Sequence, residues 1–213
     1  GTSDILKNLR ARSFYLEIMM ENLIDETLEK IGLSRANLLY VGGGHHYMIL
    51  PNTKRVKDAL DEMDAEINAW LRKNFQAELF YATGYQECSA NELENNPAGS
   101  YKKIFQGVSE RISEKKSKRY SADVIRELNK IKINDHSREC AICHRSSDWL
   151  ERDDEGRDIC PVCGGLIQLS SDILNQNFFV VSQIKSEKSL EVFEGEYLIP
   201  VKNGDELKQC MRK

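Results

Sequence analysis

The sequence has no run of apolar residues long enough to cross a membrane. A membrane-spanning helix needs roughly 20 consecutive apolar residues, and the apolar stretch nearest the start, from Leu16 to Met20, is interrupted by Glu17. The pattern of a secretory signal peptide is also missing. We therefore expect a cytoplasmic protein with no membrane contact. Because the sequence starts at Gly1 rather than at Met, we expect it to be a fragment of a longer protein.

The chain also contains little proline, and neither sign of charge is in large excess. It has 213 residues with 4 prolines, 8% aromatic residues and a formal net charge of -4. Its 40% hydrophobic and 30% charged residues are typical of one large or two smaller folded domains, not of a disordered chain. The small negative charge argues against a protein that coats nucleic acid with its whole surface.

One segment departs from this balance. Between residues 101 and 138 eleven Lys or Arg residues stand against five Asp or Glu residues, a local net charge of +6 that leaves -10 elsewhere. The densest part consists of Lys115, Lys116, Lys118 and Arg119. Two interpretations stay open, a solvated helix face or a contact with RNA or DNA phosphates.

The first half of the sequence alternates between helical and strand patterns. Apolar residues at three- and four-residue steps predict a long helix from Ile5 to Ile31, which Gly32 would end. Two short apolar runs joined by glycines predict a β-hairpin over residues 38–50. A helix capped by Thr53 and a strand over residues 77–83 should follow. With one more strand before the first helix, this order is the ferredoxin-like, or split βαβ, plan.

The second half begins with helices and ends in strands. A basic helix is expected from Tyr101 to about Lys118 and a shorter helix over residues 122–130. Three strands are expected near the end, over residues 178–183, 190–193 and 197–201. The fold class is therefore α+β.

Two pairs of cysteines have the spacing of a zinc site. Cys140 and Cys143 form one C-x-x-C pair, Cys160 and Cys163 form another, and sixteen residues separate the pairs. Four thiolates suit tetrahedral zinc and leave no open position for water, so the site should be structural. Disulfides are rare in a cytosolic chain, and a redox dithiol needs one pair rather than two. Gly164 and Gly165 should form a tight turn behind the second pair, whereas His136 and His144 are surplus to the ligand set.

The glycine-rich hairpin carries the strongest indication of function. Gly42, Gly43, Gly44 and His45 join its two strands, and glycines there would let the backbone approach a nucleotide. In nucleotidyl cyclases and palm polymerases this hairpin presents carboxylates that hold two metal ions, but residues 38–50 contain no Asp or Glu. A purely structural hairpin is the alternative, because a glycine cluster alone is weak evidence.

The hairpin and the preceding helix together resemble a known family. The segment Leu9-Arg10-Ala11-Arg12-Ser13-Phe14-Tyr15-Leu16-Glu17, followed by Tyr40-Val41-Gly42-Gly43-Gly44-His45, is similar to the first palm domain of the large subunit of type III-A CRISPR (Csm) effector complexes. A four-cysteine zinc segment follows that palm at a similar position.

The resemblance implies the function of a much longer protein. Such a subunit combines an HD nuclease that cuts single-stranded DNA with two palm domains that bind ATP and make cyclic oligoadenylate for antiviral defence. Neither the HD motif nor the Gly-Gly-Asp-Asp motif of the second palm occurs in this sequence. The fragment would supply a non-catalytic ATP-binding palm and a structural zinc site. ATP with Mg or Mn would bind only together with the second palm, and the partners would be other effector subunits, guide RNA and target RNA.

This interpretation assigns residues and segments. Gly42, Gly43, Gly44 and His45 would line the nucleotide pocket, with Arg10, Arg12 and Ser13 as weaker candidates for phosphate contacts. The segments would be a degenerate palm lacking its first strand (4–87), a basic helical segment (88–138), a zinc ribbon or knuckle (139–170) and a β-rich segment (171–213). Two other functions are considered, a stand-alone zinc-ribbon module that binds nucleic acid and an independent cyclase. The missing carboxylates argue against the cyclase.

Overall fold

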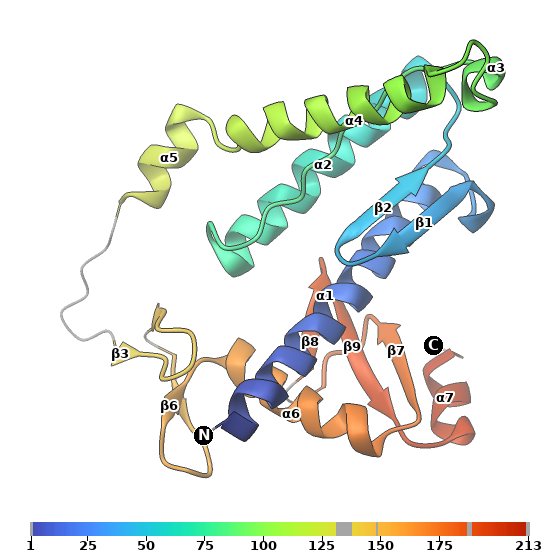
Figure 1. Cartoon of the computed structure of the whole chain (residues 1–213). Coiled ribbons are helices and arrows are strands. Elements are labelled where there is room, and N and C mark those ends of the chain that lie inside the picture. Colours follow the sequence, from blue (N-terminus) through green and yellow to red (C-terminus); the bar gives the residue numbers. More distant parts are fainter. Residues whose placement is uncertain (1, 131–137, 148, 187–188, 212–213) are drawn as a thin grey trace. The chain divides into compact units, whose positions relative to one another are not determined.

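A computed structural model describes residues 2–130, 138–147, 149–186 and 189–211 (Figure 1). The chain divides into two compact units, one formed by residues 1–49 and 133–213 and the other by residues 50–132. Each unit is described by itself. The four segments expected from the sequence stay a prediction.

The first unit is organised around helix α1 (Thr2–Ile31). The helix ends at Gly32, whose φ of +72° lies in the left-handed region, and Leu33 N–H bonds back to the carbonyl of Leu28. This is the glycine C-cap that the sequence predicted. The buried stripe of α1 consists of Ala11, Tyr15, Met19, Leu23, Ile24, Leu28 and Ile31.

Helix α1 packs against the C-terminal part of the chain. Its main neighbours are helix α6 (Pro161–Asn175) and strand β8 (Leu190–Phe193). The hydroxyl of Tyr15 donates to the carbonyl of Glu191, and the ring of Phe14 meets that of Phe179 edge-on at 4.8 Å between centroids. Strands β7 (Phe178–Ser182), β9 (Glu196–Val201) and β8 form an antiparallel sheet in the order β7-β9-β8, and helix α7 (Gly204–Met211) follows. The three predicted strands are confirmed.

Helix α6 was not expected. The tight turn predicted at Gly164 and Gly165 is wrong, because both glycines lie inside α6. Pro161 occupies the start of the helix, where its missing N–H costs nothing. Burial of Leu166 and Leu169 then stabilises the helix despite its two glycines.

The glycine hairpin also belongs to the first unit. Strand β1 (Leu38–Gly42) pairs antiparallel with β2 (His45–Met48), as predicted. A short 3-10 helix (Arg35–Asn37) precedes it, and its Arg35 forms ion pairs with Glu21 and Asp25 of α1 at 2.6 and 2.7 Å. The cysteine region contributes four two-residue strands: β3 (Arg138–Glu139), β4 (Ser146–Ser147), β5 (Glu151–Arg152) and β6 (Asp158–Ile159).

The second unit is helical in its described residues. It contains α2 (Lys54–Phe75), α3 (Ala90–Leu93), α4 (Ser100–Ser117) and α5 (Ala122–Leu128). Thr53 caps α2 as predicted, accepting a hydrogen bond from Val56 N–H at 3.3 Å. The buried side of α2 consists of Val56, Met63, Ile67, Trp70, Leu71 and Phe75.

The strand expected over residues 77–83 is not formed, so that prediction is wrong. The reason lies in the side chain of Asn68 on α2. Its Oδ1 accepts from Tyr81 N–H at 3.0 Å, and its Nδ2 donates to Tyr81 O at 2.9 Å. One side-chain amide thus satisfies the backbone groups that a neighbouring strand would otherwise pair with.

The α+β class is confirmed, and the sheets are small and mostly two-stranded. Among the described helices, none combines the length and the apolar character that a membrane crossing requires.

Candidate metal centre and glycine hairpin

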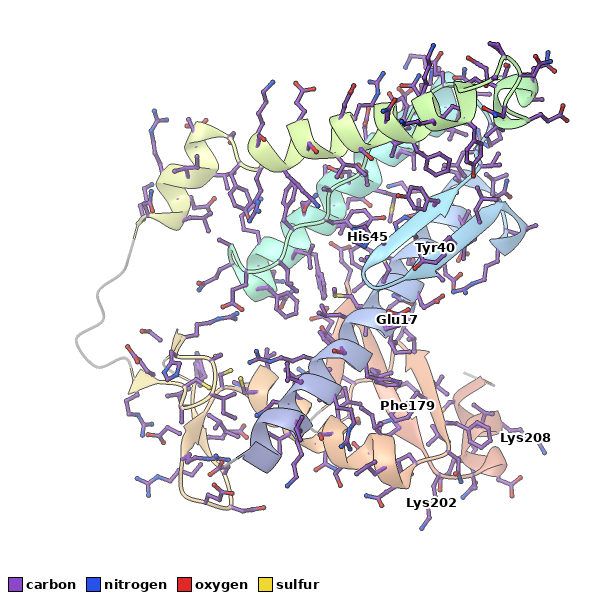
Figure 2. The ribbon with its side chains drawn as sticks, viewed as in Figure 1. Glu17, Tyr40, His45, Phe179, Lys202 and Lys208 are labelled. Carbon is purple, nitrogen blue, oxygen red and sulfur yellow. The ribbon has the colours of Figure 1, made fainter. Side chains whose placement is uncertain are left out.

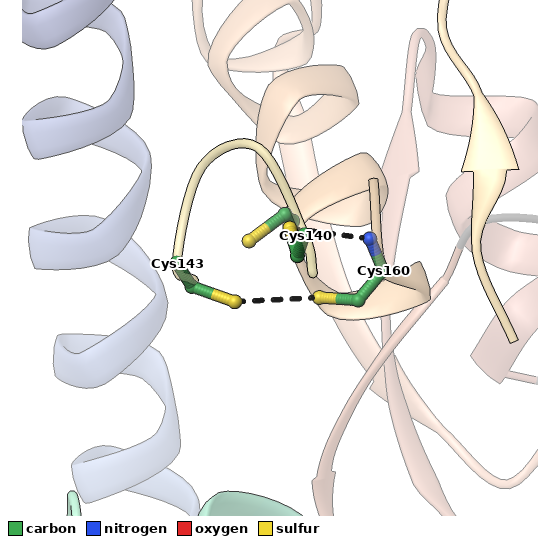
Figure 3. Close-up of side chains that lie close together, drawn as sticks. Cys140, Cys143 and Cys160 are labelled. Carbon is green, nitrogen blue, oxygen red and sulfur yellow. Dashed lines mark hydrogen bonds between the residues drawn. The ribbon is translucent and has the colours of Figure 1, made fainter. Parts of the chain in front are cut away.

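The four predicted cysteines converge on one point. Their Sγ atoms all lie within 4.8 Å of one another, and Cys143 Sγ is 3.8 Å from Cys160 Sγ (Figure 3). Sulfurs that surround one zinc ion tetrahedrally at about 2.3 Å stand nearly this far apart. A disulfide would need about 2.05 Å, and the structure has all six cysteines as free thiols.

Two backbone knuckles hold the sulfurs. Cys140 and Cys143 lie in the connection from β3 to β4, where Cys140 N–H bonds to Arg145 O at 3.0 Å and His144 N–H to Cys140 O at 2.9 Å. Cys160 follows β6 and caps α6, and Cys163 lies in the first turn of that helix. Ala141 N–H bonds to Asp158 O at 2.9 Å, which joins the two knuckles.

The four thiols do not ionise alike: the pKa values of Cys140 and Cys160 are lowered, whereas burial raises that of Cys143 and the bond to Cys160 raises that of Cys163. Burial raises the pKa of Cys140, but backbone N–H groups of Cys143, Cys160 and Ile142 outweigh it and leave the pKa lowered. The pKa of Cys160 falls to about 5, chiefly because the Cys163 thiol donates to it, and the same bond raises the pKa of Cys163. Cys160 is the N-cap residue of α6, and the positive end of the helix dipole there also favours the Cys160 thiolate. Donors of this kind also support thiolates that bind a metal.

Three of the four thiols are buried, Cys143 is half-buried, and four sulfur ligands leave no position for a substrate. Cys140, Cys160 and Cys163 are buried, and Ile142, Leu150 and Val162 pack around them. The arrangement can therefore hold one metal ion structurally. His144 is exposed and is not a member of the cluster, whereas His136 lies outside the described residues.

The glycine hairpin turns in two residues. Gly43 and Gly44 have φ values of +59° and +75°, which glycine adopts without the steric cost of a Cβ. His45 Nδ1 lies 3.0 Å from the carbonyl oxygen of Gly43, across the turn. A Cβ built on either of these glycines would meet no described atom within 4 Å, so the turn is open on its outside.

The strands of the hairpin carry aromatic and imidazole side chains. The rings of Tyr40 and Tyr47 lie 6.4 Å apart, and Tyr40 is 54% exposed (Figure 2). Burial, with a smaller effect of His45, lowers the pKa of His46, so its imidazole is neutral at physiological pH. The hairpin therefore offers an open turn, exposed aromatic surface and no carboxylate.

The predicted phosphate contacts on α1 are solvent-exposed. Arg10, Arg12 and Ser13 are all exposed, and none of their side chains has a hydrogen bond or ion pair to another described residue. The structure therefore leaves these side chains available but does not connect them to the hairpin.

The basic cluster is largely engaged within the second unit. Lys115 Nζ lies 2.7 Å from Asp64 Oδ1 and donates to Thr83 Oγ1 at 2.8 Å. Lys118 pairs with Glu114 at 2.7 Å, and the Arg119 guanidinium lies 5.4 Å from the centroid of the Phe80 ring. Lys116 has no partner among the described residues. The contact of Lys115 with Asp64 could not be predicted from the sequence, because it arises only where α4 packs beside residues 77–84.

The sequence matches one family model and is similar to several known proteins. A family model described as Csm1 subunit domain B matches residues 2–131. A protein of Enterococcus italicus named CRISPR system single-strand-specific deoxyribonuclease Cas10/Csm1 (subtype III-A) is 42% identical over 180 residues, covering 84% of this chain and 23% of that protein. Its namesake from Mycobacterium tuberculosis is 42% identical over 198 residues, covering 85% of this chain and 24% of that protein. The chain thus spans about a quarter of the length of these relatives.

Solved structures share the fold. A Csm1-Csm4 cassette in complex with one ATP matches with a TM-score of 0.65 and 22% identity, covering 93% of this chain and 23% of that chain. Csm1 from T. onnurineus matches with a TM-score of 0.62 and 21% identity, covering 93% of this chain and 22% of that one.

Proposed function

The chain belongs to the Csm1 subunit domain B family, and we propose that it serves as the non-catalytic palm of a type III-A CRISPR large subunit. In this proposal the intact subunit makes cyclic oligoadenylate and cuts single-stranded DNA, and this part supplies one wall of an ATP pocket. Related proteins carry the name of a single-strand-specific deoxyribonuclease, and related structures contain ATP or cA4.

The observation that carries the proposal is the open glycine turn without carboxylates. The outside of Gly43 and Gly44 is free of described atoms, which gives a nucleotide room to approach the backbone. Residues 38–50 contain no Asp or Glu, so the hairpin offers no hard oxygen ligands for magnesium. A second palm would then complete the pocket and supply the carboxylates, with Mg or Mn bound there.

The hairpin is proposed to be part of a ferredoxin-like sheet in the intact subunit. In the described structure β1 and β2 pair only with each other. Leu39 and Tyr40 are 57% and 54% exposed, and a two-stranded ribbon by itself is only marginally stable in water. Further strands beside the hairpin would bury this surface.

The metal in the four-cysteine cluster is proposed to be zinc. The donor set is four sulfurs, three of them buried, with backbone N–H groups directed at Cys140. Soft thiolates in a closed tetrahedral arrangement select zinc over magnesium or calcium. Bound zinc would fix the two knuckles and the start of α6 in one position.

The hairpin assignment is tested by substituting Gly43 in the intact subunit. Valine would strain the backbone at φ +59° whatever its effect on a ligand, so asparagine, which tolerates this conformation, is the informative replacement. Gly43→Asn should abolish most cyclic oligoadenylate synthesis while single-stranded DNA cleavage and complex assembly continue. Gly32→Asn is the matched control, because Gly32 also has a positive φ (+72°) and open space for a side chain but lies at the end of α1, outside the hairpin. Normal synthesis by Gly43→Asn would make the hairpin purely structural.

The alternative of a stand-alone nucleic-acid-binding zinc ribbon has less support. Lys115 and Lys118 are held in ion pairs within the second unit, which reduces the charge available for phosphates. RNA affinity that depends on these two residues would favour this alternative.

A further inference from the structure

An aromatic pair lies on the exposed side of helix α4. The rings of Tyr101 and Phe105 are 4.9 Å apart between centroids and inclined by 49°, and Tyr101 is 47% exposed. Together with Lys102, Gln106, Ser109 and Glu110 they line a shallow hollow that is open to solvent. Tyr101, Phe105 and Ser109 follow one another at four-residue steps, so they share one side of the helix.

Three lysines without partners stand along the same helix. Lys102, Lys103 and Lys116 are exposed, and none of them forms an ion pair with a described residue. The other cations of α4 are engaged, since Lys115 pairs with Asp64 and the Arg111 guanidinium lies 6.0 Å from the centroid of the Tyr85 ring. Lys102 and Lys116 are fourteen residues apart, or about 21 Å along the helix, a span that covers several phosphates of one strand.

We infer that this side of α4 binds single-stranded nucleic acid, with a base stacked on Tyr101 and the backbone following Lys102 and Lys116, which lie on the same side of the helix as the aromatic pair. Proteins that bind single strands combine aromatic rings for stacking with cations along the backbone. A duplex would not suit the site, because its bases are stacked inside. A protein partner is less suited, since lysine is depleted at the centre of protein–protein interfaces. The site uses no residue of the glycine hairpin and is independent of the proposed ATP pocket.

The test measures binding of the chain to fluorescein-labelled 20-nucleotide oligo-U RNA and to the matching oligo-dT DNA by fluorescence anisotropy. Tyr101→Ala should weaken the affinity about fivefold or more, whereas Tyr101→Phe, which keeps a stacking ring, should stay within about twofold. Lys102→Gln and Lys116→Gln should each reduce the slope of log K against log salt by about 0.7. RNA and DNA should respond alike if the site reads stacking and phosphate, and an unlabelled duplex should compete poorly.

The controls separate this site from general charge and from misfolding. Lys73→Gln changes an exposed lysine of α2 in the same unit and should leave the affinity and the salt slope unchanged. Thermal melting of Tyr101→Ala checks that the helix is intact, and Lys102→Gln, at an exposed position, provides the second test variant if it is not. The inference is overturned if Tyr101→Ala binds as tightly as the parent chain, or if Lys73→Gln weakens binding as much as Lys102→Gln. It is equally overturned if Tyr101→Ala impairs only assembly with other protein subunits. Unchanged cyclic oligoadenylate synthesis in Tyr101→Ala would leave the hairpin proposal untouched.

Discussion

The ammonium of Lys115 on α4 lies 2.7 Å from the carboxylate of Asp64 on α2. Thr83 joins the pair, because its hydroxyl donates to Asp64 at 2.7 Å and accepts from Lys115 at 2.8 Å. The Asp64 side chain is only 13% exposed, so the contact is shielded from water far better than an ordinary surface pair. Residue 115, which the sequence suggested for phosphate binding, therefore connects two helices and the segment between them.

We expect Lys115→Met to destabilise the second unit by about 1–2 kcal/mol, because Asp64 would lose its charge partner in a partly buried position. Urea unfolding followed by Trp70 fluorescence measures the effect, in a Trp149→Phe background because Trp149 is 81% exposed and would also fluoresce. Lys118→Met is the matched control, since its pair with Glu114 is exposed on both sides. Equal unfolding midpoints for the two variants would contradict this interpretation of the Lys115 contact.

Metal analysis of the purified chain should give about one zinc per molecule. Cys160→Ser should lose the metal, because apparent zinc binding by such sites is worth on the order of 10 kcal/mol and depends on the full ligand set. Hydrogen exchange should then accelerate in residues 138–147 and in the first turns of α6, which the knuckles hold. Cys88→Ser removes an exposed cysteine outside the cluster and should change neither quantity. Retention of zinc by Cys160→Ser would show that another residue provides the fourth ligand.

Local patterns in the sequence predicted most helices and strands because their causes are local. Gly32 ends α1 through its own left-handed conformation, and Thr53 caps α2 through its own hydroxyl. The convergence of the four cysteines was predictable for the same reason, since each C-x-x-C pair is a self-contained knuckle. The four-cysteine cluster is thus the part of the candidate site that the spacing alone identified.

The features that escaped prediction depend on contacts between distant residues. Helix α6 contains two adjacent glycines and forms because its apolar side packs on α1, more than 100 residues away in sequence. The strand expected over residues 77–83 had a suitable composition, but Asn68 occupies the backbone groups of Tyr81. No pattern within residues 77–83 indicates that a side chain on another element would replace a strand.

The two candidate arginines of α1 should behave differently from each other. Arg10 and Ser13 are three residues apart and share one side of the helix, whereas Arg10 and Arg12 are two apart and point in different directions. A single nucleotide pocket can therefore use only one of these arginines together with Ser13, and we expect it to be Arg10.

In the intact subunit Arg10→Gln should raise the KM for ATP several-fold with little change in kcat, because a contact made equally in the ground and transition states affects binding alone. Arg12→Gln is the matched control and should leave KM unchanged, and neither variant should alter the melting temperature, because both side chains are exposed and without partners among the described residues. A rise in KM for Arg12→Gln as large as that for Arg10→Gln would mean that the arginines act through general charge and not through one directed contact.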